Sequence, residues 1–171
     1  MILKTKMRHV CYLDHKAKEL DLILSGKKKM LIRGAMGRKL PYGRVFEGDE
    51  LFFINNNGEG KIKSKCRVKK VLNSDKMDEK ESLDLIEIHQ KKLKLTDDQL
   101  RRWAGKRYLV LIEIDSVQSI RELVFDKSRY STMNDWVILS DGYTQKLFES
   151  LSLVLQNQHQ VSYETPGLRS L

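Results

Sequence analysis

The chain has 171 residues, which suits one domain with a sizeable core and is slightly short for two. Hydrophobic residues make up 40% and charged residues 32%, so the composition excludes a disordered chain, and no apolar run suits a membrane span or a signal peptide. We therefore expect a cytoplasmic protein without a membrane partner. Cys11 and Cys66 are too few for a disulfide framework, and the four histidines lack ligand spacing, so we expect no metal and no other cofactor.

The net charge of +9 is concentrated in one region of the chain. Between Gly26 and Lys70 the sequence has thirteen Lys or Arg against four Asp or Glu, so this stretch holds the whole excess of nine. A concentrated positive field attracts polyanions and speeds their encounter. The charge therefore indicates a nucleic acid as partner, although any single lysine could serve solubility alone.

The N-terminal part is predicted to hold two short strands and a helix. Residues 10–12 form the first strand, and the apolar spacing of residues 14–24 predicts a helix with Asp14 as its N-cap and Gly26 just beyond its end. Residues 29–33 alternate as a second strand. Three glycines and Pro41 then predict a loop over residues 34–43.

The next segment is predicted to form a β-hairpin. Residues 45–54 contain a turn at Gly48 and a β-prone run, and residues 55–58, which are Asn-Asn-Asn-Gly, close it as a hairpin turn. Residues 61–69 alternate apolar and basic side chains, which predicts one buried face and one charged face. The charged face is a ladder of five cations that a bound anion or flanking acidic groups would stabilise: Lys61, Lys63, Lys65, Arg67 and Lys69.

Helices and buried strands are predicted to follow. Residues 79–93 have a helical apolar stripe, and Thr96 with Gln99 forms a capping box for a short helix that runs through Trp103. The apolar run at residues 108–114 predicts a strand covered on both faces, residues 120–125 are a weaker strand candidate, and residues 135–139 are predicted as a last short strand.

The C-terminal part is predicted to leave the domain body. Residues 143–155 have apolar side chains at helical spacing, so they form a helix that docks on the body or on a partner. The expected organisation is a domain over residues 1–140, a helix within 141–156 and a disordered tail over 157–171. The element order predicts an α+β protein, a small mixed β-barrel decorated by helices.

The segment from Gly26 to Arg33 resembles the signature of the ASCH family of PUA-like barrels. Gly26, Lys28 and Arg33 match that signature, and the order of the later elements fits the family over about residues 7–140. The resemblance implies a compact barrel with a cleft beside the signature segment that binds RNA or modified nucleosides.

An enzymatic branch of the family, the acetylcytidine amidohydrolases, suggests an alternative function. Its lysine would correspond to Lys28, but Leu31 stands where that branch has threonine, and residues 89–93 lack the glutamate expected there. A lysine without those partners is poorly activated. The alternative is a hydrolase acting on a modified nucleoside or a small amide, with Lys28 in its active site.

The preferred interpretation is an RNA-binding or other nucleic-acid-binding module. Arg33 suits phosphate because its planar guanidinium matches phosphate oxygens, but it could instead pair with a structural carboxylate such as Asp49. Tyr42 could stack on a base or cap the barrel core. A third possibility is a protein-interaction module that uses the C-terminal helix. The residues predicted to contact nucleic acid are Gly26, Lys28, Arg33, Arg38, Lys39, Tyr42, Arg44, Lys61, Lys63, Lys65 and Arg67.

Overall fold

The computed structural model describes residues 5–130, 134–142 and 144–151, and the tail expected at residues 157–171 lies outside them. The elements in chain order are β1 (Arg8–Leu13), α1 (Glu19–Leu24), β2 (Met30–Ala35), β3 (Glu50–Asn55), β4 (Lys61–Asn73), α2 (Glu79–Leu93), α3 (Asp97–Trp103), β5 (Tyr108–Val124), the 3₁₀ helix η1 (Lys127–Arg129) and β6 (Trp136–Ile138). Residues 144–151 are also helical, within the predicted C-terminal helix, and the rest of that prediction lies outside the described residues. None of the described helices is both long and apolar enough to span a membrane.

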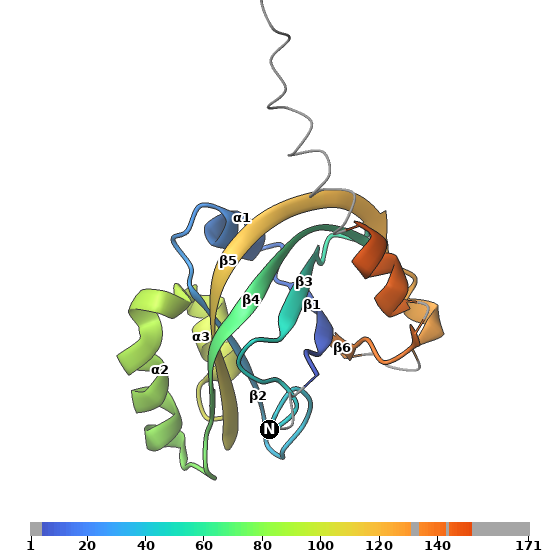
Figure 1. Cartoon of the computed structure of the whole chain (residues 1–171). Helices are drawn as coiled ribbons and strands as arrows, with labels where there is room; N and C mark the ends of the chain where they lie inside the picture. Colours follow the sequence, from blue (N-terminus) through green and yellow to red (C-terminus); the bar gives the residue numbers. More distant parts are fainter. Residues whose placement is uncertain (1–4, 131–133, 143, 152–171) are drawn as a thin grey trace, which may run out of the picture.

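The strands of the described residues form one mixed sheet in the order β2-β5-β4-β3-β1-β6. The β1 and β3 strands are parallel, and the other neighbours are antiparallel. The sheet curls into a half-barrel, with β2 and β6 at its two ends (Figure 1). This confirms the predicted α+β class and the mixed, barrel-like sheet.

The side chains inside the curved sheet form one apolar core. It includes Leu31 from β2, Phe53 from β3 and Trp136 from β6, all at most 1% exposed. The strand alternation predicted for residues 29–33 is confirmed, because Met30 and Ile32 face the opposite side of the sheet from Leu31.

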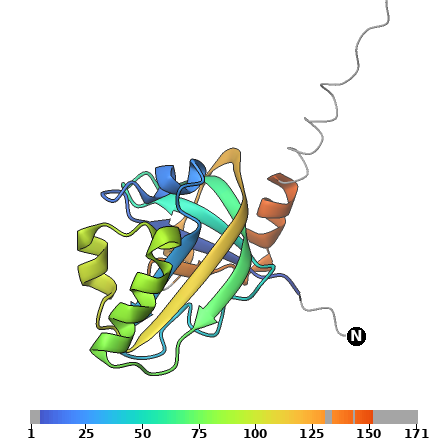
Figure 2. The ribbon, with the colours of Figure 1, turned by 90° about the vertical axis from the view of Figure 1, so that its left-hand side faces the viewer.

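Helices cover the outer face of the sheet at two places. The α2 and α3 helices pack against β2 and β5 on one half, where Ile86 and Leu93 meet Met30 and Ile32. The helix at residues 144–151 covers the other half, where the Phe148 ring lies 4.1 Å from the Phe52 ring. Figure 2 shows these two helical coverings on opposite flanks of the long β4 and β5 strands.

Two predicted boundaries are wrong for local reasons. Asp14 does not cap α1, because residues 14–18 form a turn in which the Asp14 carboxylate accepts the Ala17 N–H at 3.1 Å. The helix therefore starts at Glu19, after Lys18 in a left-handed conformation. The strands predicted at residues 108–114 and 120–125 are one strand, β5, which continues through Ser116 at a φ of 53°.

The turn predicted at Gly48 before the β-prone run is confirmed, because β3 begins only at Glu50. The buried Asp49 carboxylate accepts the backbone N–H groups of Met7 at 3.1 Å and Phe46 at 2.9 Å, and this holds the segment before β3 as a turn. Gly48 has a φ of 90°, which favours glycine at this turn.

Candidate nucleic-acid interface

Two adjoining cavities lie between the β2 end of the sheet and the β1–β6 end. The first, which we call the Gln99 cavity, has a volume of about 260 Å³ and is lined mainly by residues 12–16, by Gln99 and Arg102 of α3, and by Arg33. The second, the Tyr42 cavity, has a volume of about 140 Å³ and is lined mainly by residues 33–42 and by Tyr108. Both cavities share Arg33, Trp103 and Asp135, so together they form one cleft.

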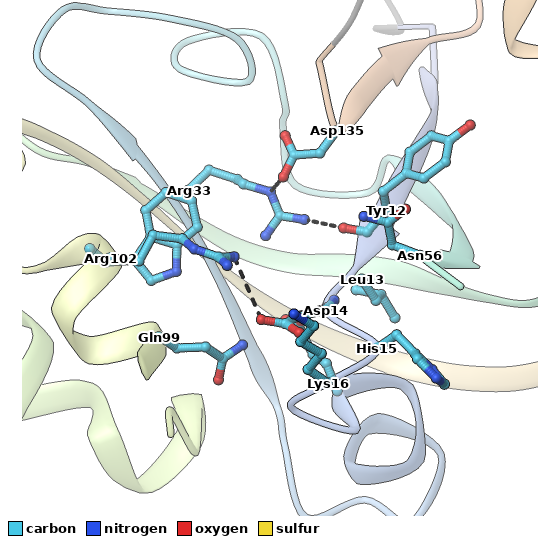
Figure 3. A pocket seen from close by; sticks show the side chains of 12 residues that line it. Tyr12, Leu13, Asp14, His15, Lys16, Arg33, Asn56, Gln99, Arg102 and Asp135 are labelled. Atoms are coloured by element: carbon cyan, nitrogen blue, oxygen red, sulfur yellow. Dashed lines mark hydrogen bonds and ion pairs between the residues drawn. The ribbon is translucent and has the colours of Figure 1, made fainter. Parts of the chain in front are cut away.

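Arg33 is the fixed centre of this cleft (Figure 3). Its side chain leaves β2 and donates to the carbonyls of Ile32 and Tyr12, both at 2.7 Å, and to Cys11 Sγ at 3.1 Å. Its Nε lies 2.9 Å from Asp135 Oδ2. Arg33 therefore pairs with Asp135 and not with Asp49, the carboxylate considered from sequence, and its 6% exposure leaves only a small part of it open to a ligand.

A buried hydrogen-bond chain anchors β6, and Asp135, which directly precedes this strand, lines the cleft. Trp136 Nε1 lies 3.0 Å from His9 Nδ1, and His9 Nε2 lies 2.9 Å from Asp49 Oδ2. Because an indole N–H can only donate, Nδ1 of His9 is the acceptor and the proton sits on Nε2, which donates to Asp49. Burial lowers the pKa of His9, so the neutral form fits this chain.

Lys28 lies behind the cleft wall. Its ammonium group is 3.6 Å from Glu19 Oε1 and also donates to the Leu93 carbonyl, and only 2% of the residue is exposed. Burial lowers the pKa of Lys28, and the Glu19 carboxylate opposes this shift. Glu19 itself lines the Gln99 cavity and accepts the Asp14 N–H at 2.8 Å. Lys28 thus pairs with Glu19, which lines the cavity, but Lys28 itself is not a lining residue.

The Gln99 cavity has a polar and charge-balanced lining. Lys16, Arg33 and Arg102 are balanced by three carboxylates, those of Asp14, Glu19 and Asp135. Arg102 Nη1 lies 3.5 Å from Asp14 Oδ2, as the dashed line in Figure 3 marks. A balanced lining of this kind suits a neutral ligand with hydrogen-bond donors and acceptors better than a phosphate.

The Tyr42 cavity is lined by aromatic rings and by bare backbone. The Tyr42 and Tyr108 rings meet edge to face at 5.6 Å, and the Arg38 guanidinium lies 5.6 Å from the first ring and 5.4 Å from the second. A Cβ on Gly34 would lie 2.5 Å from Leu109 Cδ2, so this position has no room for a side chain. The glycine therefore serves the packing of β2 on β5 and leaves open backbone at the cavity.

The cations of residues 34–44 have no acidic neighbour in their own segment. Among the described residues, Arg38, Lys39 and Arg44 form no ion pair, and all three are exposed. Lys39 lines the Tyr42 cavity, whereas Arg44 lines neither cavity. The loop therefore brings unpaired positive charge to one mouth of the cleft.

The predicted charged face of β4 lies away from both cavities. Lys61 pairs with Glu122 at 2.7 Å, Lys65 with Glu50 at 3.6 Å, and Arg67 donates to Asp115 at 3.0 and 3.1 Å. Lys63 lies 3.5 Å from Glu59. Acidic residues on β3, β5 and the β3–β4 turn therefore flank the ladder. The sequence predicts that either a bound anion or flanking acidic groups stabilise these cations, and the structure has the acidic groups.

The structure brings together only some of the residues predicted from sequence. Arg33, Lys39 and Tyr42 line the cleft and Arg38 stacks beside it, whereas Gly26 and Lys28 lie at a separate hollow near the end of α1. Sequence reasoning missed the lining residues that come from other segments, among them Asp14, Gln99, Arg102, Tyr108 and Asp135. The capping box at Thr96 was the one signal that drew attention to Gln99, and it indicated a structural role.

A metal site is not evident in the part of the chain that the structure describes, because no three His, Cys, Asp or Glu side chains gather there. Cys11 and Cys66 are both buried free thiols, and burial raises the pKa of Cys11 to about 12. Neither thiol is therefore a nucleophile at neutral pH.

Neither a protein-family model nor a curated protein matches the chain. Among solved structures, ASCH from Zymomonas mobilis superposes with a TM-score of 0.60 at 19% sequence identity, covering 83% of this chain and 94% of that one. A variant of the same protein gives a TM-score of 0.61 at 18% identity, covering 83% and 96%. Identity this low speaks for the fold alone, and it confirms the fold expected from the resemblance. The chain thus has an ASCH-like fold.

Proposed function

We propose that this chain is an RNA-binding module and that the cleft around Arg33 is its binding site. The observation that carries the proposal is the fixed Arg33–Asp135 pair between a polar cavity and an aromatic cavity, with unpaired cations at the mouth. Unpaired RNA bases are bound by aromatic rings and by hydrogen bonds to their edges, and the backbone by cations. The cleft offers all three kinds of contact.

The phosphates are expected at the loop and not inside the Gln99 cavity. The charges lining that cavity cancel, whereas Arg38, Lys39 and Arg44 are exposed and form no ion pair among the described residues. A phosphate therefore gains more from the loop than from the cavity. The role of Lys61, Lys63, Lys65 and Arg67 as further RNA contacts stays a prediction, and their acidic neighbours would weaken it.

The alternative of a hydrolase with Lys28 in its active site has less support. The Lys28 ammonium faces Glu19 and the Leu93 carbonyl, and Lys28 is not among the residues that line either cavity of the cleft. A nucleophile or base must reach the reacting atom of the substrate. Incubating the protein with acylated cytidines tests this alternative, and turnover that is lost in Lys28→Met with the fold intact would favour it.

Fluorescence anisotropy with a short labelled single-stranded RNA tests RNA binding. Lys39→Ala should weaken binding and reduce the slope of log K against log salt by about 1, because one phosphate contact is lost. Lys80→Ala is the control, since Lys80 is an exposed lysine on α2 that lines neither cavity and whose ammonium pairs with Asp84 at 3.0 Å. The proposal fails if no RNA binds at low salt, or if both variants lose affinity equally.

A further inference from the structure

The two cavities of the cleft are each small, but they adjoin. Their volumes of about 260 and 140 Å³ lie below the roughly 300–1,000 Å³ typical of pockets for drug-sized ligands. Neither cavity alone therefore holds two consecutive nucleotides. They share a wall made of Arg33, Asp135 and Trp103. Two flat groups joined by a short linker would therefore fit the cleft better than one larger group.

The Gln99 cavity has hydrogen-bond groups of fixed identity. Gln99 Oε1 accepts the Thr96 N–H at 3.1 Å in the capping box at the start of α3, so the oxygen is held by the helix. The amide Nε2 has no partner among the described residues and remains a donor for a ligand. Asp135 uses Oδ2 towards Arg33, which leaves Oδ1 as an acceptor. A base edge that carries both an acceptor and a donor complements this pair.

The Tyr42 cavity offers ring surface in place of base-edge contacts. The Tyr42 hydroxyl is occupied, since it donates to the Ser74 carbonyl at 2.5 Å. What remains for a ligand is the surface of the Tyr42 and Tyr108 rings beside the Arg38 guanidinium. Every base has a π face, so stacking of this kind tolerates any sequence.

We propose that the cleft binds two consecutive unpaired nucleotides, one base in each cavity. Gln99 and Asp135 read one base by hydrogen bonds, and the Tyr42 and Tyr108 rings hold its neighbour by stacking. This inference rests on the proposed RNA-binding function and adds a minimal ligand, a dinucleotide step, with selectivity at one of its two positions. A paired RNA does not fit, because its bases are already stacked and paired.

Isothermal titration with mononucleotides and with dinucleoside monophosphates tests the ligand side. A dinucleotide should bind roughly 5- to 150-fold more tightly than either mononucleotide, the gain expected from one stacked base. Changing the base at one position should alter affinity over a similar range, and changing it at the other position should alter it little. Equal affinity for mononucleotides and dinucleotides would overturn the inference.

The Gln99→Glu variant tests the protein side. A glutamate keeps the capping-box acceptor for the Thr96 N–H but replaces the donor Nε2 by an acceptor oxygen. The order of base preference should therefore change, and a melting curve measures separately what the added buried carboxylate costs in stability. Tyr42→Leu is the contrasting variant and should weaken all dinucleotides by a similar factor. An unchanged order of base preference in Gln99→Glu would refute the proposal that Gln99 reads one of the two bases.

Binding of longer RNA distinguishes a failure of the dinucleotide inference from a failure of the proposed RNA-binding function. If a longer single-stranded RNA binds at low salt while dinucleotides bind no better than mononucleotides, the dinucleotide inference is wrong and the RNA-binding function stands. If the longer RNA does not bind either, both are wrong. A melting curve for each variant shows whether a loss of binding comes from unfolding.

Discussion

The side chain of Arg33 joins the two ends of the sheet to each other, with its Nε 2.9 Å from Asp135 Oδ2. Arg33 stands on β2, at one end, and Asp135 directly precedes β6, at the other. The two partners are unequal, since the side chain of Arg33 is 7% exposed and that of Asp135 is 52% exposed. Substituting them should therefore have unequal consequences.

Arg33→Met should destabilise the protein by roughly 1–3 kcal/mol, because the carbonyls of Ile32 and Tyr12 lose the guanidinium that bonds them. Asp135→Asn should cost much less, because the side chain is half exposed and the amide oxygen still accepts from Arg33. Urea denaturation of both variants measures the difference. Equal losses would show that the ion pair, and not the buried carbonyl contacts, is what Arg33 contributes.

Lys28→Met should be more costly, at about 3–5 kcal/mol, because it leaves the Glu19 carboxylate buried without its cation. Adding Glu19→Gln should recover part of this loss, since the amide oxygen can still accept the Asp14 N–H. The same urea experiment on the single and double variants gives the coupling free energy. Additive losses in the double variant would contradict a direct pair.

Stability should fall in mildly acidic buffer because of His9. Burial lowers the pKa of His9 below the unfolded value of 6.5, so the stability due to neutral His9 is complete above pH 6.5 and is lost as the pH falls towards the lowered pKa. Protonation of Nδ1 would also remove the acceptor of the Trp136 N–H. Nitrogen NMR of the imidazole checks this, and a protonated ring at pH 6.5 would contradict it. Denaturation at several pH values should show a shallower pH dependence in His9→Gln.

The C-terminal helix should contribute to the stability of the body. Phe148 is 1% exposed and packs on Phe52, so Phe148→Ala should cost about 3–5 kcal/mol. Glu149→Ala is a control on the same helix, because its ion pair with Arg8 is exposed and should matter little. If Phe148→Ala leaves the free energy of unfolding unchanged, the helix does not stay packed on the body in solution.

Elements with a strong local pattern could be predicted from the sequence. The boundaries predicted for α2, the capping box of Thr96 and Gln99 before α3, and the alternation along β4 are all confirmed. In each of these cases the residues that define the element are close together in the sequence. The core positions of β5 follow for the same reason, because an uninterrupted apolar run must be covered on both faces.

The cleft could be predicted only in part, because its contacts join distant segments. Arg33 was identified as a site residue, but its partner Asp135 lies about a hundred positions further on, and nothing local distinguishes it from Asp49. Lys28 was predicted to contact nucleic acid, yet it is buried because the end of α2 and Glu19 of α1 meet around it. The short helix that ends at Trp103 was predicted, but nothing in its local pattern indicated that Trp103 lines both cavities.

The position of β2 and β6 at the two ends of the sheet has a consequence for self-association. An exposed sheet edge offers unpaired N–H and C=O groups on which a strand of another molecule can add. Here α2 and α3 pack against β2, and the Arg33 guanidinium occupies the Tyr12 carbonyl on β1 beside β6. The residue at the centre of the cleft thereby satisfies one backbone carbonyl at the β1–β6 end of the sheet. Loss of Arg33 should promote aggregation at protein concentrations that the parent chain tolerates.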